Sequence, residues 1–101
     1  RTEEYIHYNQ LFDIYGNLLN EREKEIFSLF YEEDLSLQEI ADLRSVSKSA
    51  IGNTITTINN KLDTYEEKLE FLKKINDLEL LAEDIKEEKV KEKLKKIIKM
   101  C

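Results

Sequence analysis

The 101-residue sequence contains no proline, and its only glycines are Gly16 and Gly52. A β-sheet protein of this length needs many tight turns, which depend on glycine, proline or Asn-Gly pairs. A glycine-rich phosphate-binding loop is excluded for the same reason. Apolar residues make up 41% of the chain, which is enough to exclude wholesale disorder. We therefore predict an all-α fold.

Residues that carry catalytic or metal chemistry are equally scarce. His7 is the only histidine, Cys101 is the only cysteine, and tryptophan is absent. These residues cannot form a nucleophile–base pair or a dedicated zinc site, so we expect no enzyme activity, metal or cofactor. A lone cysteine is typical of an incidental thiol in a cytoplasmic protein. No run of 18 apolar residues is present, so we expect no membrane span. Because residue 1 is arginine, the sequence fits a trimmed or processed chain.

The charge is unevenly distributed along the chain. The net charge is −6, and residues 1–36 alone hold nine acidic and three basic groups. Residues 86–99 instead hold seven lysines and three glutamates. The acidic first third disfavours indiscriminate binding to nucleic acid, whereas the basic end suits an anionic partner.

Helix-start signals predict a helix-turn-helix in the middle of the chain. Asn20–Glu23 and Ser36–Glu39 have the spacing of capping boxes, and Ser47 is a good N-cap. We therefore expect a short supporting helix over 37–43, in which Leu43 adds to the inward face, and a second helix that starts at Ser47.

Two further patterns describe the ends of the chain. Apolar residues from Tyr8 to Leu18 recur at helical spacing and predict one face of a first helix. In the tail, Asn76–Glu79 has the spacing of another capping box, so we expect a helix to begin there. The apolar stripe shifts between Ile85 and Val90, which predicts a turn near 84–88.

The strongest periodicity is a three-heptad apolar seam, which predicts one helix of roughly 28 residues that includes all of 47–72. The seam consists of Ile51, Ile55, Ile58, Leu62, Tyr65, Leu69 and Leu72. We expect its first half to close the helix-turn-helix core. Its second half, Leu62, Tyr65, Leu69 and Leu72, then needs the tail or a second copy of the chain to cover it, and we expect a homodimer. We divide the chain into a bundle over 1–62 and an extension over 63–101 that fold as one cooperative unit.

Three stretches together resemble a known family. They are Leu19 to Phe27 (LNEREKEIF), Leu35 to Ala41 (LSLQEIA) and Val46 to Ile51 (VSKSAI). Their order is similar to region four of bacterial primary sigma factors, and more closely to the small YlxM-like helix-turn-helix proteins. The resemblance also covers Leu11 to Tyr15 and Asp63 to Leu69, so it spans residues 8–75.

The resemblance implies an all-α fold like sigma region four, with a long C-terminal helix and no catalytic residues. It also implies an accessory or regulatory role in the signal recognition particle pathway, with the particle's protein or RNA as partner. The chain departs from the pattern at the turn over Leu43 to Ser45, which lacks the usual glycine, and at Gly52, where a bulky residue is usual. Both departures count against the reading of DNA bases.

Two surfaces are candidates for binding. A DNA-binding transcription regulator would use the start of the second helix, with Arg44, Lys48, Ser49, Asn53, Thr56 and Lys61 as candidates. RNA or an acidic partner would use the tail lysines Lys89, Lys91, Lys93, Lys95, Lys96 and Lys99. Each set also fits an ordinary solvated helix face, and the chain fits a plain dimerisation module.

Overall fold

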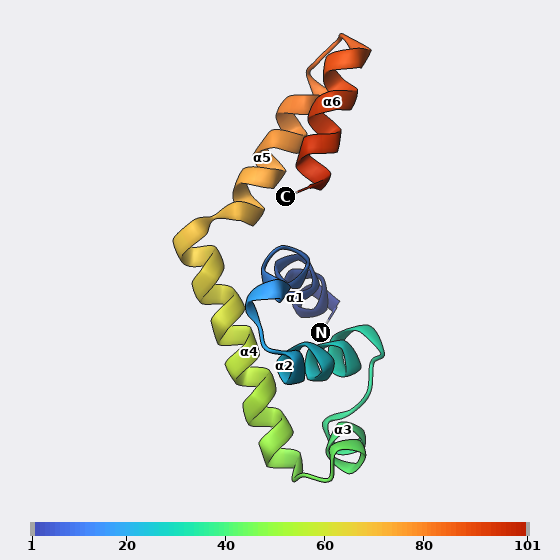
Figure 1. The fold of residues 1–101 in the computed structure, drawn as a ribbon, viewed down its shortest axis with the longest axis vertical. Coiled ribbons are helices and arrows are strands. Elements are labelled where there is room, and N and C mark those ends of the chain that lie inside the picture. Colours follow the sequence, from blue (N-terminus) through green and yellow to red (C-terminus); the bar gives the residue numbers. More distant parts are fainter. Residues whose placement is uncertain (1, 101) are drawn as a thin grey trace. The chain divides into compact units, whose positions relative to one another are not determined.

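The structure is a computed structural model that describes residues 2–100, and every secondary-structure element within this range is a helix, as predicted. The elements are α1 (Thr2–Tyr15), the 3₁₀-helix η1 (Gly16–Leu18), α2 (Glu21–Phe27), the π-helix η2 (Ser28–Glu32), α3 (Leu37–Arg44), α4 (Lys48–Leu69), α5 (Phe71–Glu83) and α6 (Glu88–Lys99) (Figure 1). They form two compact units, unit 1 (Arg1–Lys68) and unit 2 (Leu69–Cys101). The boundary predicted from the sequence lies six residues earlier, after residue 62. No helix within residues 2–100 is long and apolar enough to cross a membrane.

The predicted helix starts in unit 1 are confirmed by their hydrogen bonds. The side chain of Asn20 accepts a hydrogen bond from the Glu23 N–H, and the side chain of Ser36 accepts one from the Glu39 N–H. In each pair the glutamate carboxylate accepts a second hydrogen bond, from the backbone N–H of the capping residue. Ser47 Oγ accepts from the Ala50 N–H at 3.1 Å. These bonds satisfy N–H groups that have no partner inside their own helix, so each helix begins at a defined residue.

The core of unit 1 lies between α4 and the preceding helices. Its fully buried large side chains are Leu11, Tyr15, Phe27, Ile26, Ile40, Ile51, Ile58 and Leu62. Tyr31 in η2 joins this core: its ring lies 4.7 Å from that of Phe27 and 4.8 Å from that of Tyr5, between centroids. Asn59 of α4 donates to the Tyr31 hydroxyl at 2.9 Å, so one side chain ties η2 to α4.

The end of the first helix differs from the prediction. The helix stops at Tyr15, and the chain tightens into η1, which leaves Leu18 57% exposed rather than on the buried stripe. Gly16 is buried, and a Cβ there would lie 3.1 Å from the ring of Phe12. The ring of Phe12 in turn stacks on Phe27 with centroids 4.1 Å apart. This close packing explains why a glycine stands where the helix ends.

The helix-turn-helix is present, with α3, a short turn and α4. The turn has no glycine, and Ser45 takes the left-handed conformation (φ 56°). Leu43 is 64% exposed, which makes the prediction of an inward-facing Leu43 wrong. Its neighbours Ile40 and Ala41 are fully buried, so the buried face of this short helix is narrower than predicted.

The single helix predicted over 47–72 is also wrong at its end. Helix α4 stops at Leu69, and Glu70 takes a left-handed conformation (φ 53°) before α5 begins at Phe71. Side-chain periodicity continues through the break, so it could not reveal a change in one backbone angle.

Unit 2 is a hairpin of α5 and α6 that run side by side in opposite directions (Figure 1). The predicted turn is confirmed, because α5 ends at Glu83 and α6 begins at Glu88. The predicted start at Asn76 is wrong: Asn76 lies inside α5, which already begins at Phe71. Cys101, for which the sequence predicts an incidental thiol, lies outside the described residues.

Candidate nucleic-acid and partner surfaces

The start of α4 presents a polar surface to solvent. Lys48, Ser49, Asn53 and Thr56 are all exposed, and the last three lie at i, i+4 and i+7 along one line of the helix. The structure therefore brings these four predicted residues together. A helix line of hydroxyl and amide groups can hydrogen-bond phosphates or base edges.

The other two predicted basic residues of this surface are tied to α2. Arg44 Nη1 lies 2.8 Å from Glu25 Oε2, and Lys61 Nζ lies 2.7 Å from Glu23 Oε2. Glu23 is only 6% exposed. Burial by itself raises the pKa of Glu23, but hydrogen bonds from Lys61 and from the Asn20 N–H lower the pKa below its usual value. Arg44 and Lys61 therefore stabilise unit 1 and offer little free positive charge to DNA.

One cationic residue near this surface was missed by the sequence analysis. The guanidinium of Arg22 on α2 donates to Thr54 Oγ1 on α4 at 3.4 Å, so Arg22 lies beside the helix-turn-helix. No local pattern could have found it, because the contact depends on how α2 packs against α4. Within residues 2–100, Lys48 makes no ion pair. The surface thus holds far fewer free cations than a typical DNA-binding module.

The predicted dimer seam is divided by the fold. Leu62 is fully buried in the core of unit 1, and Tyr65 is half-buried with its ring 5.8 Å from that of Tyr15. Leu69 is 40% exposed, and Leu72 is half-buried. Leu62 is therefore unavailable to a second copy, because helices of its own unit already cover it.

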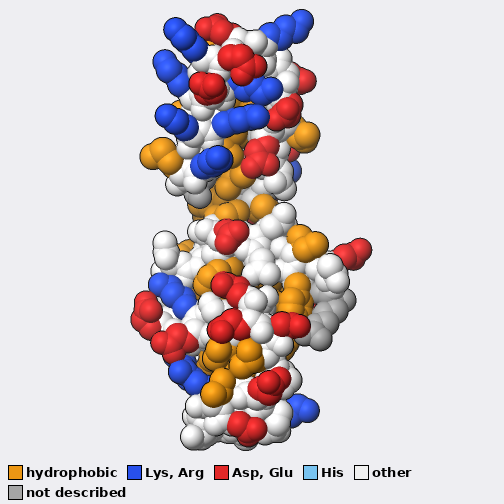
Figure 2. All heavy atoms as spheres, turned by 90° about the vertical axis from the view of Figure 1, so that its right-hand side faces the viewer, with side chains coloured by type: hydrophobic (Ala, Val, Ile, Leu, Met, Phe, Trp, Pro, Cys, Tyr) orange, Lys and Arg blue, Asp and Glu red, His pale blue; other side chains and the backbone are white. Residues whose placement is uncertain are grey.

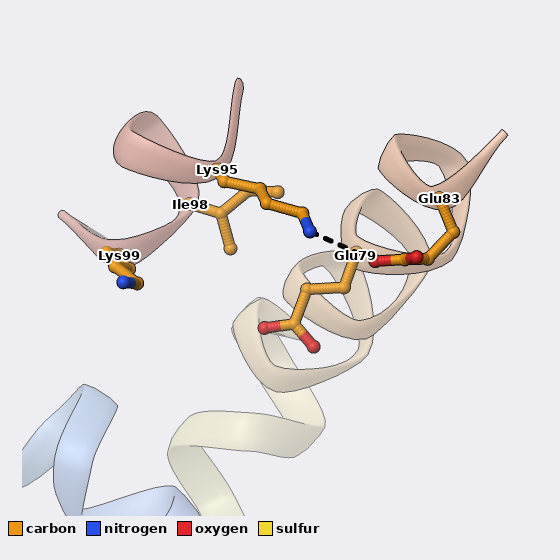
Figure 3. A pocket seen from close by; sticks show the side chains of 5 residues that line it. All are labelled: Glu79, Glu83, Lys95, Ile98 and Lys99. Atoms are coloured by element: carbon orange, nitrogen blue, oxygen red, sulfur yellow. Dashed lines mark ion pairs between the residues drawn. The ribbon is translucent and has the colours of Figure 1, made fainter. Parts of the chain in front are cut away.

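The tail lysines of α6 fall into two groups. Lys91 and Lys95 contact Glu83 on α5 at 3.8 Å and 3.3 Å, and the pKa of Glu83 is lowered, chiefly by its hydrogen bond from Lys95. A cavity of about 240 Å³ lies beside these ion pairs and is lined by Glu79, Glu83, Lys95, Ile98 and Lys99. Figure 3 shows Lys95 pointing from α6 toward the carboxylate of Glu83 on α5.

The second group points away from α5. Lys89, Lys93 and Lys96 are exposed and lie at i, i+4 and i+7, so they form one line on the helix; we call them the outward lysines. They make no ion pair within the described part of the chain. Figure 2 shows lysine side chains, with carboxylates among them, over the segment formed by α5 and α6. This line is the densest free positive charge in the described chain.

The described residues offer no metal centre. Within residues 2–100, no three His, Cys, Asp or Glu side chains are grouped so that they could hold an ion. His7 Nε2 instead lies 3.1 Å from Asp63 Oδ1, and Tyr8 donates to the same carboxylate at 2.8 Å. Burial and this hydrogen bond raise the pKa of Tyr8 to about 12. These polar groups hold α1 on α4.

Comparisons with known proteins agree with this architecture. Residues 2–100 match the family model described as "Putative helix-turn-helix protein, YlxM / p13 like". A UPF0122 protein of Clostridium perfringens (strain 13) is 39% identical over 95 residues, which cover 89% of this chain and 85% of the relative. UPF0122 proteins of Bacillus cereus (strain AH187) and Bacillus anthracis (strain A0248) are each 38% identical, over 89% of this chain and 86% of the relative. The chain therefore belongs to the YlxM/p13-like helix-turn-helix family.

Proposed function

We propose that the protein is a non-enzymatic cytoplasmic accessory protein of the signal recognition particle pathway, and that α6 contacts the particle's RNA. The family resemblance supports the choice of pathway. The arrangement of charge supports the choice of surface: Arg44 and Lys61 of the helix-turn-helix pair with α2 and leave Lys48 as its one candidate cation without an ion pair within residues 2–100, whereas the three outward lysines of α6 face solvent. In this proposal, unit 1 is a scaffold that also carries most of the acidic residues.

The observation that carries the proposal is the line of Lys89, Lys93 and Lys96. Three ammonium groups on one side of a helix can bind consecutive phosphates without reading bases. The only aromatic side chain of unit 2 is Phe71, so base stacking has no platform on α6. We therefore expect binding that depends on RNA backbone and shape rather than on sequence.

The test is a gel-shift titration with purified signal recognition particle RNA and the full chain, repeated at several salt concentrations. Replacing all three outward lysines by glutamine should lower the affinity and reduce the salt slope by about 2, because each phosphate that is no longer neutralised lowers the slope by roughly 0.7. The matched control replaces Lys91, Lys95 and Lys99, which line or bridge the hairpin, and should change the slope much less. Equal effects of the two triple variants, or no RNA binding at low salt, would reject the proposal. Binding only to the particle's protein would also reject the RNA contact.

A second candidate function is DNA binding by α4. The exposed line of Ser49, Asn53 and Thr56 favours it, because such groups can contact the major groove. Binding of duplex DNA at low salt should then weaken in an Asn53→Ala variant. The control is Asn60→Ala, an exposed asparagine farther along the same helix. Absence of any duplex binding at low salt would exclude this function.

A further inference from the structure

The two broad faces of the unit 2 hairpin differ in chemistry. Ala82 on α5 and Ile98 on α6 are buried between the helices. Successive residues of an α-helix are turned by about 100°, so the residue before and the residue after a buried position point to opposite faces. Leu81 and Ile97 precede the buried residues. Glu83 and Lys99 follow them.

One face is polar and already paired. Glu83 bonds to Lys91 and Lys95 across the hairpin, and Glu79 and Lys99 line the same cavity (Figure 3). Because the helices are antiparallel, the residues that follow Ala82 and Ile98 share this face. The residues that precede them share the opposite face.

The opposite face is apolar and open to solvent. It consists of Leu78 (36% exposed) and Leu81 (58%) on α5, and Val90 (46%) and Ile97 (59%) on α6; we call these four residues the apolar face. Val90 and Ile97 are seven residues apart, and Leu78 and Leu81 are three apart, so each pair lies along one side of its helix. Four large aliphatic side chains on one side of a small hairpin form a contiguous patch of the kind that marks an interaction surface.

The charges that border this face are arranged in a matching pattern. On α5, Asp77 and Asp84 stand four residues before and three residues after Leu81. Lys86, in the connection just before α6, and Lys93 on α6 stand four residues before and three residues after Val90. All four are exposed, and none makes an ion pair within residues 2–100. The apolar face therefore has an acidic border along α5 and a basic border along α6.

We propose that a second copy of the same hairpin covers this face. A two-fold rotation about an axis parallel to the helices places α5 of one copy over α6 of the other, so that each acidic border meets a basic border. The result is a four-helix bundle with a Leu/Val/Ile core. An anionic membrane would meet the repelling carboxylates of Asp77 and Asp84. An RNA would leave the aliphatic side chains without apolar contacts. The proposal shares only Lys93 with the RNA contact, because Lys89 and Lys96 stay outside the interface.

Sedimentation equilibrium of the full chain tests the proposal. We expect a dimer at twice the chain mass of 12.0 kDa. Leu81→Glu should weaken self-association by at least about tenfold, because it places a carboxylate among aliphatic side chains. The matched control is Leu80→Glu: Leu80 is 70% exposed and points away from the apolar face, so this variant should still dimerise. A monomer at all concentrations, or equal effects of the two variants, would overturn the proposal.

A charge-swap experiment tests the two-fold arrangement itself. The double variant Asp77→Lys, Asp84→Lys and the double variant Lys86→Glu, Lys93→Glu should each dimerise more weakly, because like charges then face each other. An equimolar mixture of the two should form a heterodimer, because their borders are complementary again. The control Lys89→Glu, Lys96→Glu carries the same change in charge on the outer side and should leave dimerisation intact. Failure of the mixture to associate while the wild-type chain dimerises would refute this pairing.

Discussion

The position of Leu62 allows a sharp test of where the unit 1 core ends. Leu62 is fully buried, whereas Leu69, two turns later on the same seam, is 40% exposed. Truncation of a fully buried leucine to alanine removes transfer energy and leaves a cavity, which costs about 3–4 kcal/mol of unfolding free energy. For Leu69 the loss should be about 1 kcal/mol or less, because part of the side chain is already in water. Leu62→Ala should therefore destabilise unit 1 several times more than Leu69→Ala.

Urea denaturation followed by tyrosine fluorescence measures this difference. All five tyrosines lie in unit 1 and tryptophan is absent, so the signal reports the unfolding of that unit. With a urea m-value of about 1.5 kcal/mol/M, Leu62→Ala should lower the midpoint by about 2 M. The shift should not depend on protein concentration, since the leucine is covered by its own chain. Similar midpoints for the two variants would refute the conclusion that the core of unit 1 ends between Leu62 and Leu69. A shift that vanishes at high protein concentration would show that a second copy covers Leu62.

Three further outcomes follow from the packing and the ion pairs of unit 1. Gly52→Ala should stabilise the protein by about 0.5–1 kcal/mol in thermal melts, because the new Cβ lies at an ordinary 3.8 Å from Leu37 and glycine is costly inside a helix. Gly16→Ala should instead destabilise it by about 1–2 kcal/mol, since the Cβ meets a stacked aromatic ring at 3.1 Å; a raised Tm would contradict this reasoning. The lowered pKa of Glu23 contributes stability above the ordinary carboxyl pKa of about 4.3, and this stability is lost as the pH falls through the folded-state pKa. Urea midpoints should therefore fall between about pH 5 and pH 3, and less steeply in Glu23→Gln; equal slopes would exclude a role for this carboxyl.

The sequence predicted the parts of the fold that depend on neighbouring residues. The side chains of Asn20, Ser36 and Ser47 each accept a hydrogen bond from the backbone N–H three residues later, and each of these bonds marks the start of a helix in the structure. The buried first half of the seam follows from helical periodicity in the same way. The same spacing at Asn76 was misleading, because α5 had already begun and an asparagine inside a helix can face solvent.

The parts that could not be predicted depend on distant contacts or on single backbone angles. The left-handed Glu70 ends α4 although the apolar pattern continues. The pairing of Arg44 with Glu25 and of Lys61 with Glu23 requires α2 to pack beside α3 and α4. Because of these ion pairs, Arg44 and Lys61 are poor candidates for contacts with nucleic acid. In the sequence alone, both residues are simply positive charges near the helix-turn-helix.

The π-helix at Ser28–Glu32 has a consequence for the lengths that this chain can tolerate. Its wide turn is closed by a bond from the Glu33 N–H to the Ser28 carbonyl at 2.9 Å, and it carries Tyr31, whose hydroxyl also donates to Glu4 at 3.3 Å. Deleting one residue from this turn would rotate Tyr31 by about 100° and withdraw its ring from those of Tyr5, Tyr8 and Phe27. An insertion or deletion in the π-helix should therefore destabilise the protein much more than one in the connection over 84–87.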